Sequence, residues 1–198
     1  MQTKNERIAA ARKATKERRS QMTPKIIKVK IQENRLSKSD IDRLEGIFRE
    51  AKWLRNLAVS ELHGPRNEFN YSALKEVEVL NKDGEYEHRK LKYLTSQMRQ
   101  KIVDEIGDNL SSLSSLKKNG SKVGALKYKS RVWSVGLKQH GITYKVIAHN
   151  KICIQGFSRR ALKVNGLEQL NAYETYEFAD AKLIKKVSGY YIYILQSM

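Results

Sequence analysis

The chain has 198 residues, of which 40% are hydrophobic and 30% charged, and its 39 lysines and arginines outnumber its 21 aspartates and glutamates, giving a net charge of +18. A single cysteine excludes an internal disulfide, and no apolar run reaches the roughly 18 residues that cross a membrane. The excess of positive charge predicts a polyanionic partner, with nucleic acid favoured over an acidic membrane surface, and we expect a cytoplasmic protein.

Residues 1–22 form a predicted basic arm. Residues 1–20 carry seven basic and two acidic side chains, and their alanines favour a helix, but they contain no apolar stripe that would dock a helix onto a core. We therefore expect a flexible or helical arm that becomes ordered along a phosphate backbone, with an ordinary disordered tail as the alternative.

Residues 23–36 contain the first predicted strand. In KIIKVKIQEN, Ile27, Val29 and Ile31 alternate with Lys28 and Lys30. Because side chains along a strand point alternately to its two faces, this period predicts a half-buried strand with a basic outer face.

Two helices are predicted within residues 37–123. The first has Ser37 or Ser39 as its N-cap and ends at Gly64-Pro65, and the second begins near Thr95. Both have apolar residues at three- and four-residue steps, which is typical of helices that pack on a core. We interpret NKDGEYEHRK, which lies between them, as a turn-rich connection. The two expected core stripes are Ile41, Leu44, Phe48, Ala51, Leu54, Ala58 and Leu62, and Leu94, Met98, Ile102, Ile106, Leu110 and Leu113.

After Gly124 the apolar period changes from helical to alternating, which predicts strands with turns at His149-Asn150 and Ser188-Gly189. Because a lone early strand is not stable by itself, we expect the first strand to pair with these late strands. The predicted fold class is therefore α+β, a β-barrel or bent sheet with the helices inserted after its first strand. The five candidate strands are 142–148, 151–157, 172–178, 181–187 and 190–196.

The segment GALKYKSRVWSVGLKQHGITYK interleaves basic and aromatic side chains. Cations bind phosphates and flat rings stack on bases, so this composition is typical of a nucleic-acid interface. If the chain is extended here, Lys127, Lys129 and Arg131 lie on one side, and Tyr128 lies on the other. The alternative is that Tyr128 and Trp133 anchor the core beneath a solvated basic face.

No catalytic or metal-binding motif is found in the sequence. The four histidines are scattered, the single cysteine excludes a CxxC pair, and no phosphate-binding GxxxxGK[ST] loop, GxGxxG or GxSxG motif is present. Asp104 and Glu105 are neighbours on a predicted helix, where we expect them to diverge into solvent. We therefore expect no enzyme activity, no bound metal and no cofactor.

Four segments carry short motifs in a particular order. Trp53 in the first predicted helix is followed by Arg55 and Asn56, and the second helix begins with Ser-Gln-x-x-Gln. GALKYKSRVWS is similar to a segment usually written with Pro-Arg-Phe-Lys, although it lacks the proline, and AKLIKKVSGYYIYI is similar to a strand pair whose turn ends in glycine and aromatics. Over about residues 25–195 this order resembles the N-terminal half of transposon-encoded TnpB proteins and the related compact type V CRISPR effectors.

The resemblance implies an OB-like β-barrel, the wedge domain, made of residues 23–36 and 124–198, with a helical recognition lobe at 37–123 inserted into it. It implies guide RNA and target DNA as partners, with base pairing reading the sequence while the protein binds the backbones. We expect Gln97, Gln100 and Ser134 to contact a motif beside the target. The full set of candidate nucleic-acid-binding residues is Arg55, Asn56, Gln97, Arg99, Gln100, Lys127, Tyr128, Lys129, Arg131, Trp133, Ser134, Lys138, Arg159 and Arg160.

In the family that the chain resembles, the next strand begins a RuvC-like nuclease domain and carries an Asp that binds a catalytic metal. This chain ends before such a strand, so we expect a binding module without the nuclease, such as a truncated or decayed transposon gene. Two alternatives stay open: one half of a split RNA-guided endonuclease that works with a separate RuvC chain, and a stand-alone basic RNA- or DNA-binding regulator.

Overall fold

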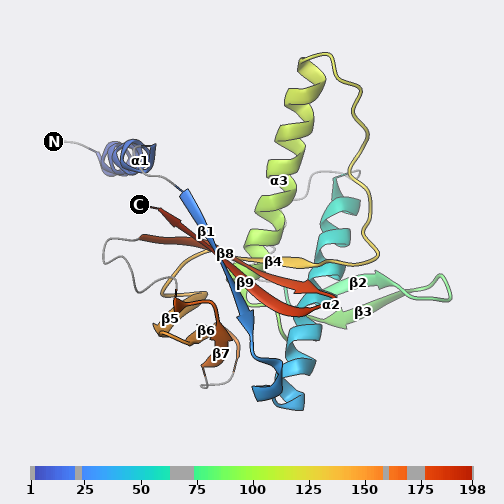
Figure 1. The fold of residues 1–198 in the computed structure, drawn as a ribbon. Helices are drawn as coiled ribbons and strands as arrows, with labels where there is room; N and C mark the ends of the chain where they lie inside the picture. Colours follow the sequence, from blue (N-terminus) through green and yellow to red (C-terminus); the bar gives the residue numbers. More distant parts are fainter. Residues whose placement is uncertain (1–2, 21–23, 63–73, 158–160, 169–176, 198) are drawn as a thin grey trace.

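The computed structural model describes residues 3–20, 24–62, 74–157, 161–168 and 177–197, which form helices and antiparallel strands (Figure 1). In chain order the elements are α1 (Lys4–Ser20), β1 (Pro24–Ile31), a 3-10 turn (Glu33–Arg35), α2 (Lys38–Glu61), β2 (Glu76–Leu80), β3 (Tyr86–Lys90), α3 (Ser96–Lys118), β4 (Ser134–Leu137), β5 (Tyr144–Ala148), β6 (Lys151–Ile154), β7 (Leu162–Asn165), β8 (Glu177–Lys186) and β9 (Gly189–Ser197).

Seven antiparallel strands form one curled sheet in the order β4-β8-β9-β1-β7-β6-β5, and β2 pairs with β3 in a separate hairpin (Figure 1). β1 lies between the late strands β9 and β7, where Lys30, for example, is paired with Tyr191 on one side and Asn165 on the other. The predicted pairing of the first strand with the late strands is therefore confirmed, and so is the α+β fold class.

One face of the sheet is buried, and we call it the inner face. Val29 of β1, Leu183 of β8 and Ile192 of β9 are fully buried in one cluster that also contains Leu44 and Ala51 of α2. The residues that alternate with them on each strand lie on the opposite, outer face, because successive side chains on a strand point to opposite sides. α2 thus covers the inner face and leaves its own far side for other contacts.

The start of α2 is fixed by a capping box. Ser37 Oγ accepts a hydrogen bond from the backbone N–H of Asp40 at 3.2 Å, and the Asp40 carboxylate accepts one from the backbone N–H of Ser37 at 3.0 Å. These bonds satisfy N–H groups that a helix start leaves without partners, so Ser37 and not Ser39 is the N-cap. The predicted stripe is buried in the middle of α2, but its end residues Ile41 and Leu62 are exposed.

A buried carboxylate fixes the chain that leads into α3. Glu50 of α2 is only 2% exposed, and its carboxylate accepts the backbone N–H groups of residues 92, 93 and 94 at 2.8, 2.8 and 2.9 Å. Three such bonds stabilise a charge that would be costly to bury alone. They hold the segment directly before Thr95, whose side chain accepts a hydrogen bond from the Met98 N–H and caps α3.

α3 is buried along its first half only. Met98, Ile102 and Ile106 are buried as predicted, whereas Leu110 and Leu116 are exposed. Figure 1 shows the C-terminal part of α3 extending away from the sheet. The predicted core stripe is therefore right for the first half of the helix and wrong at Leu110.

Four strands lie where none was predicted. NKDGEYEHRK is not a simple connection but contains the turn and the whole second strand of the β2–β3 hairpin, with Gly84 at φ +83° in the turn. β4 and β7 have four residues each, too few to display a period. The predicted strand 172–178 lies outside the described residues except for its last two, which begin β8.

α1 packs little against the rest of the protein, since most of its described side chains are exposed. It is helical over Lys4–Ser20, within the predicted basic arm. None of the helices in the described ranges is both long enough and apolar enough to span a membrane.

Candidate nucleic-acid interface

The side of α2 that faces away from the sheet carries basic and aromatic residues. Arg49, Lys52, Trp53 and Asn56 follow one another within two turns, at spacings that place them on one side of the helix. Arg89 from β3 and the segment 130–133 that precedes β4 lie next to them. We define the α2 surface as Arg49, Lys52, Trp53, Arg89, Arg131 and Trp133.

Three hollows meet on the α2 surface, with volumes of about 270, 500 and 480 Å³. Arg49 lines the first and second, Lys52 the first and third, and Trp53 the second and third, so the hollows are neighbours around one turn of α2. Small-molecule sites are mostly apolar with a few polar groups. A continuous, uneven surface with this many cations suits an extended polyanion better.

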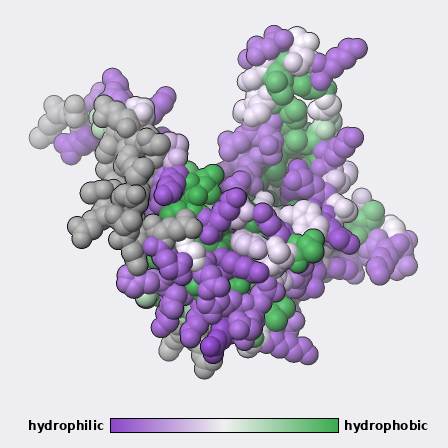
Figure 2. All heavy atoms as spheres, viewed as in Figure 1, coloured by the Kyte–Doolittle hydropathy of each residue, from purple (hydrophilic) through white to green (hydrophobic). Residues whose placement is uncertain are grey.

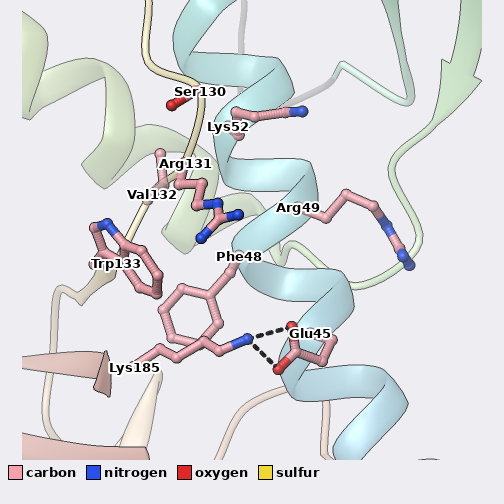
Figure 3. A pocket seen from close by; sticks show the side chains of 9 residues that line it. All are labelled: Glu45, Phe48, Arg49, Lys52, Ser130, Arg131, Val132, Trp133 and Lys185. Carbon is pink, nitrogen blue, oxygen red and sulfur yellow. Dashed lines mark hydrogen bonds and ion pairs between the residues drawn. The ribbon is translucent and has the colours of Figure 1, made fainter. Parts of the chain in front are cut away.

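Figure 3 shows the first hollow, which lies between α2 and the segment 130–133. Phe48 and Trp133 both line it, and the guanidinium carbon of Arg131 is 5.8 Å from the ring centroid of Trp133. Trp133 is 48% exposed, so its ring is not a core anchor. A half-exposed indole beside a guanidinium offers a stacking face and a phosphate-binding charge in one place.

Trp53 lies between two more guanidinium groups. The guanidinium carbons of Arg49 and Arg89 are 5.9 and 4.9 Å from its ring centroid. The ring is half-buried and also packs against the main core. Trp53 therefore orders two cations at the surface while it remains part of the protein interior.

The cations of the first hollow have few acidic partners. Within the described part of the chain, Arg49, Lys52 and Arg131 form no ion pair. Lys185, in contrast, is paired with Glu45, whose two carboxylate oxygens lie 2.5 and 2.7 Å from Nζ. Unbalanced positive charges repel one another, and a phosphate in this hollow would relieve that repulsion.

Glu45 is the acidic residue that lines the first hollow, and it is ionised at neutral pH. Burial opposes its ionisation, but hydrogen bonds from Lys185 and Tyr190 and the charges of Lys185 and Arg49 outweigh burial and lower the pKa of Glu45. Burial, the hydrogen bond to Glu45 and its charge raise the pKa of Tyr190. The cluster thus joins α2 to β8 and β9 beneath the hollow.

Two candidate residues of α2 hold the basic segment in place. Asn56 Nδ2 donates to the carbonyl of Lys129, and Asn56 Oδ1 accepts from the Lys129 N–H, both at 2.9 Å. Arg55 Nη1 donates to the carbonyl of Lys127 at 3.1 Å. Burial lowers the pKa of Arg55, and the charge of Glu105 opposes this effect. Both side chains contact protein backbone, so they act as positioning residues.

The basic segment is exposed and irregular. Residues 121–129 form no strand or helix, and Lys127, Tyr128 and Lys129 are all exposed, Tyr128 to 62%. The alternative that Tyr128 is a core anchor is wrong, because its ring is exposed and lines the third hollow. Since Asn56 and Arg55 bind the backbone of this loop, all three side chains remain available to a ligand.

Other candidates lie away from the α2 surface. Gln97 and Gln100 are on the first turns of α3 and line none of the three hollows, and their side chains form no hydrogen bond with a described residue. Arg99 donates from its guanidinium to the carbonyl of Leu74, before β2, and burial lowers the pKa of Arg99. Ser134 is half-buried at the start of β4. Ser134 belongs to the basic segment, but Gln97, Arg99 and Gln100 line none of the hollows beside it.

The last candidates have other positions. Lys138 is paired with Asp104 at 2.8 Å, and Glu105 lies 3.3 Å from a lysine of β8. The two acids diverge to different partners, as expected, and Asp104 is exposed, but Glu105 is half-buried, so the expectation of solvent exposure is wrong for Glu105. Arg159 and Arg160 lie outside the described residues. In the ranges that the structure describes, no three His, Cys, Asp or Glu side chains gather where they could hold a metal ion.

Sequence reasoning missed Arg49 and Lys52. Their spacing from Trp53 on the side of α2 opposite the apolar stripe is a signal that could have identified them. The positions of Arg89 and Lys185 could not be predicted from the neighbouring sequence. They lie on β3 and β8, and only the tertiary fold places them next to α2.

No protein-family model matches this chain, and no curated protein matches it. The resemblance of the four motifs to TnpB-type proteins therefore stays a prediction.

Proposed function

We propose that this chain is a nucleic-acid-binding module whose α2 surface holds a phosphate backbone and whose neighbouring rings stack on bases. The observation that carries this proposal is that Arg49, Lys52 and Arg131 line one hollow without forming an ion pair with any described residue. Trp53 and Trp133 lie beside guanidinium groups at the same surface. Cations combined with rings in this way suit nucleic acid.

The resemblance of the motifs to TnpB-type proteins makes the proposal more specific. The chain then corresponds to the guide-RNA- and target-DNA-binding half of a TnpB-type RNA-guided nuclease that works in the cytoplasm. The curled sheet would be the OB-like wedge barrel. α2, the β2–β3 hairpin and α3, which lie between β1 and β4 in the chain, would be the inserted recognition lobe. The pairing of β1 with β9 and β7 supports this interpretation.

The proposal assigns different roles to the candidate residues. Arg131, Lys127 and Lys129 bind phosphates, and Trp133 and Tyr128 stack on bases or sugars. Arg55 and Asn56 position the loop that carries these groups. Gln97 and Gln100 contact base edges beside the target, because amides bind an adenine edge through two hydrogen bonds.

A charge-matched comparison tests the proposed surface. The triple variant Arg49→Gln, Lys52→Gln, Arg131→Gln is compared with Lys82→Gln, Lys117→Gln, Lys145→Gln, which removes the same charge from exposed lysines elsewhere. Gel shifts with the RNA that co-purifies with the protein are expected to show about a tenfold or greater loss of affinity for the first variant beyond that of the second. Equal affinities of the two variants would contradict the assignment.

Gel shifts also separate the leading proposal from its alternatives. Binding to target DNA only when a guide RNA is present supports the RNA-guided module. Tight binding to duplex DNA without any RNA supports the stand-alone regulator. Activity that appears only when a separate RuvC chain is added supports the split nuclease, and cleavage by this chain alone with Mg²⁺ contradicts the proposal that it binds without cutting.

A further inference from the structure

The outer face of the sheet carries lysines and tyrosines on neighbouring strands. On β1, Lys28 and Lys30 flank the buried Val29, and on β9, Tyr191 and Tyr193 alternate with buried residues in the same way. In the register of the two strands, Lys28 is paired with Tyr193 and Lys30 with Tyr191. With one residue from β8 added, we define the outer cluster as Lys28, Lys30, Lys186, Tyr191 and Tyr193.

Three ammonium groups surround the two rings of the outer cluster. The Nζ atoms of Lys28 and Lys30 lie 5.7 and 5.8 Å from the ring centroids of Tyr193 and Tyr191. Lys186 Nζ lies 5.6 Å from the Tyr191 centroid and 5.2 Å from that of Tyr193. The three lysines are exposed and both rings are half-exposed, so rings and charges are open to a ligand together.

The lysines of the outer cluster form no ion pairs. Within the described residues, Lys28, Lys30 and Lys186 have no acidic partner within 4 Å. The carboxylate of Glu33 lies over Gly189 in the adjoining turn, near the Lys30 side chain but beyond ion-pair distance. Exposed sheets are stabilised when opposite charges face each other across strands. Here lysines face tyrosines instead, which leaves a cationic face that an anion would stabilise.

The outer cluster is separate from the α2 surface. The buried layer that contains Val29 and Ile192 of the sheet and Leu44 of α2 lies between them. Figure 2, drawn from the same viewpoint as Figure 1, shows that hydrophilic side chains cover much of this face of the molecule. A ligand segment on one of the two surfaces therefore leaves the other free for a second segment.

The ring spacing selects the kind of ligand. Tyr191 and Tyr193 are two residues apart on one strand, so their side chains are about 6.7 Å apart. Stacked bases in a duplex follow each other at about 3.4 Å and have no free faces for side chains. Only bases of an unpaired strand can separate and lie on the two rings, with the lysines beside the rings in reach of the phosphates.

The geometry points to a second nucleic-acid site on the outer face, which binds a single-stranded segment with bases on Tyr191 and Tyr193 and phosphates on Lys28, Lys30 and Lys186. This inference goes beyond the proposed function, because it adds a site for an unpaired strand on the face of the sheet opposite α2. Single-stranded RNA and single-stranded DNA share the chemistry that the site recognises.

The test uses two matched ring variants of the full chain. Tyr191→Leu, Tyr193→Leu removes the stacking faces, whereas Tyr191→Phe, Tyr193→Phe keeps them and removes only the hydroxyls. Labelled oligouridylate and oligothymidylate of about 12 nucleotides separate RNA from DNA as the ligand, and a duplex of similar charge serves as the reference. We expect the leucine variant to bind the single strands about tenfold or more weakly, with the phenylalanine variant and all duplex affinities nearly unchanged.

The outcomes distinguish the two proposals. If the single-strand affinity of a folded leucine variant equals that of the natural chain, the outer cluster is not a site, although the α2 surface can still be one. If the natural chain binds none of the three probes, both proposals fail. Photo-cross-linking of 4-thiouridine RNA to the unaltered protein gives a second test that does not depend on a variant folding. Cross-links to Tyr191 or Tyr193 are expected, and cross-links confined to other segments would overturn the inference.

Discussion

Asn56 holds the backbone of Lys129 with both ends of its amide. Its Nδ2 donates to the Lys129 carbonyl and its Oδ1 accepts from the Lys129 N–H, each at 2.9 Å. A side-chain amide that pairs with a backbone residue in this way fixes both the position and the direction of the chain. The loop that carries Lys127, Tyr128 and Lys129 therefore has a defined course over α2, although it forms no helix or strand.

Replacing Asn56 by alanine is expected to lower the free energy of unfolding by about 1–3 kcal/mol, because two hydrogen bonds to the backbone are lost. RNA affinity should fall as well, since the exposed side chains of the loop lose their support. For stability, Gln100→Ala is the matched control, because that amide is exposed and forms no hydrogen bond with a described residue. Urea unfolding checks both variants, and equal stability of the two would contradict the role given to Asn56.

Glu50→Gln is expected to destabilise the fold by about 2–4 kcal/mol, because an amide nitrogen would replace a carboxylate oxygen that faces backbone N–H groups. The three N–H groups of residues 92–94 would then compete for one oxygen. Glu78→Gln, on the exposed side of β2, removes the same charge and should change stability by less than about 0.5 kcal/mol. Chemical denaturation measures the stability of the two variants. Equal stabilities of Glu50→Gln and Glu78→Gln would contradict the role given to the Glu50 carboxylate.

Two helical glycines should respond to alanine with opposite signs. Alanine normally stabilises a helix interior by about 1 kcal/mol relative to glycine. At Gly46 of α2, however, the new Cβ would lie 2.2 Å from Tyr93 Cδ2, so Gly46→Ala should cost about 1–3 kcal/mol. At Gly107 of α3 no atom lies within 4 Å, so Gly107→Ala should raise the melting temperature. An increase in melting temperature for both variants would show that Tyr93 does not pack against α2.

Acid should weaken the contact between α2 and the end of the sheet. The folded-state pKa of Glu45 lies below its ordinary value of 4.5, so its stabilising contribution is present above pH 4.5 and is lost as the pH falls through the folded pKa. Because the Glu45 side chain is 40% exposed, solvent screening limits this contribution to under about 1 kcal/mol. The stability difference between the natural chain and Glu45→Gln should therefore shrink on acidification. A difference that is constant from neutral to acid pH would contradict this account.

Local periods predicted the parts of the fold whose apolar residues repeat. The alternation at Ile27, Val29 and Ile31 identified β1, and the helical spacing identified α2 and the first half of α3. The β2–β3 hairpin could not be predicted from the sequence. Val77 is the only fully buried side chain in its two strands, so the strands have almost no alternating apolar pattern. β4 and β7 escaped because four residues are too few to display a period.

The candidate site could be predicted only where its residues adjoin in the chain. Composition alone pointed to Arg131 and Trp133, which are indeed exposed beside each other. The role of Asn56 could not be read from the sequence, because its partner Lys129 is 73 residues away. The same holds for Arg89, which reaches Trp53 only once the hairpin has packed against α2.

The salt dependence of RNA binding tests the central claim most directly. When a phosphate contact is removed, the slope of log affinity against log salt concentration decreases by roughly 0.7–0.9. Between roughly 50 and 200 mM salt, Arg49→Gln, Lys52→Gln, Arg131→Gln should therefore show a slope about 2 units shallower than that of the charge-matched variant Lys82→Gln, Lys117→Gln, Lys145→Gln. Identical slopes for the two variants, or a natural chain whose affinity does not change with salt, would contradict the claim that the α2 surface holds a nucleic-acid backbone.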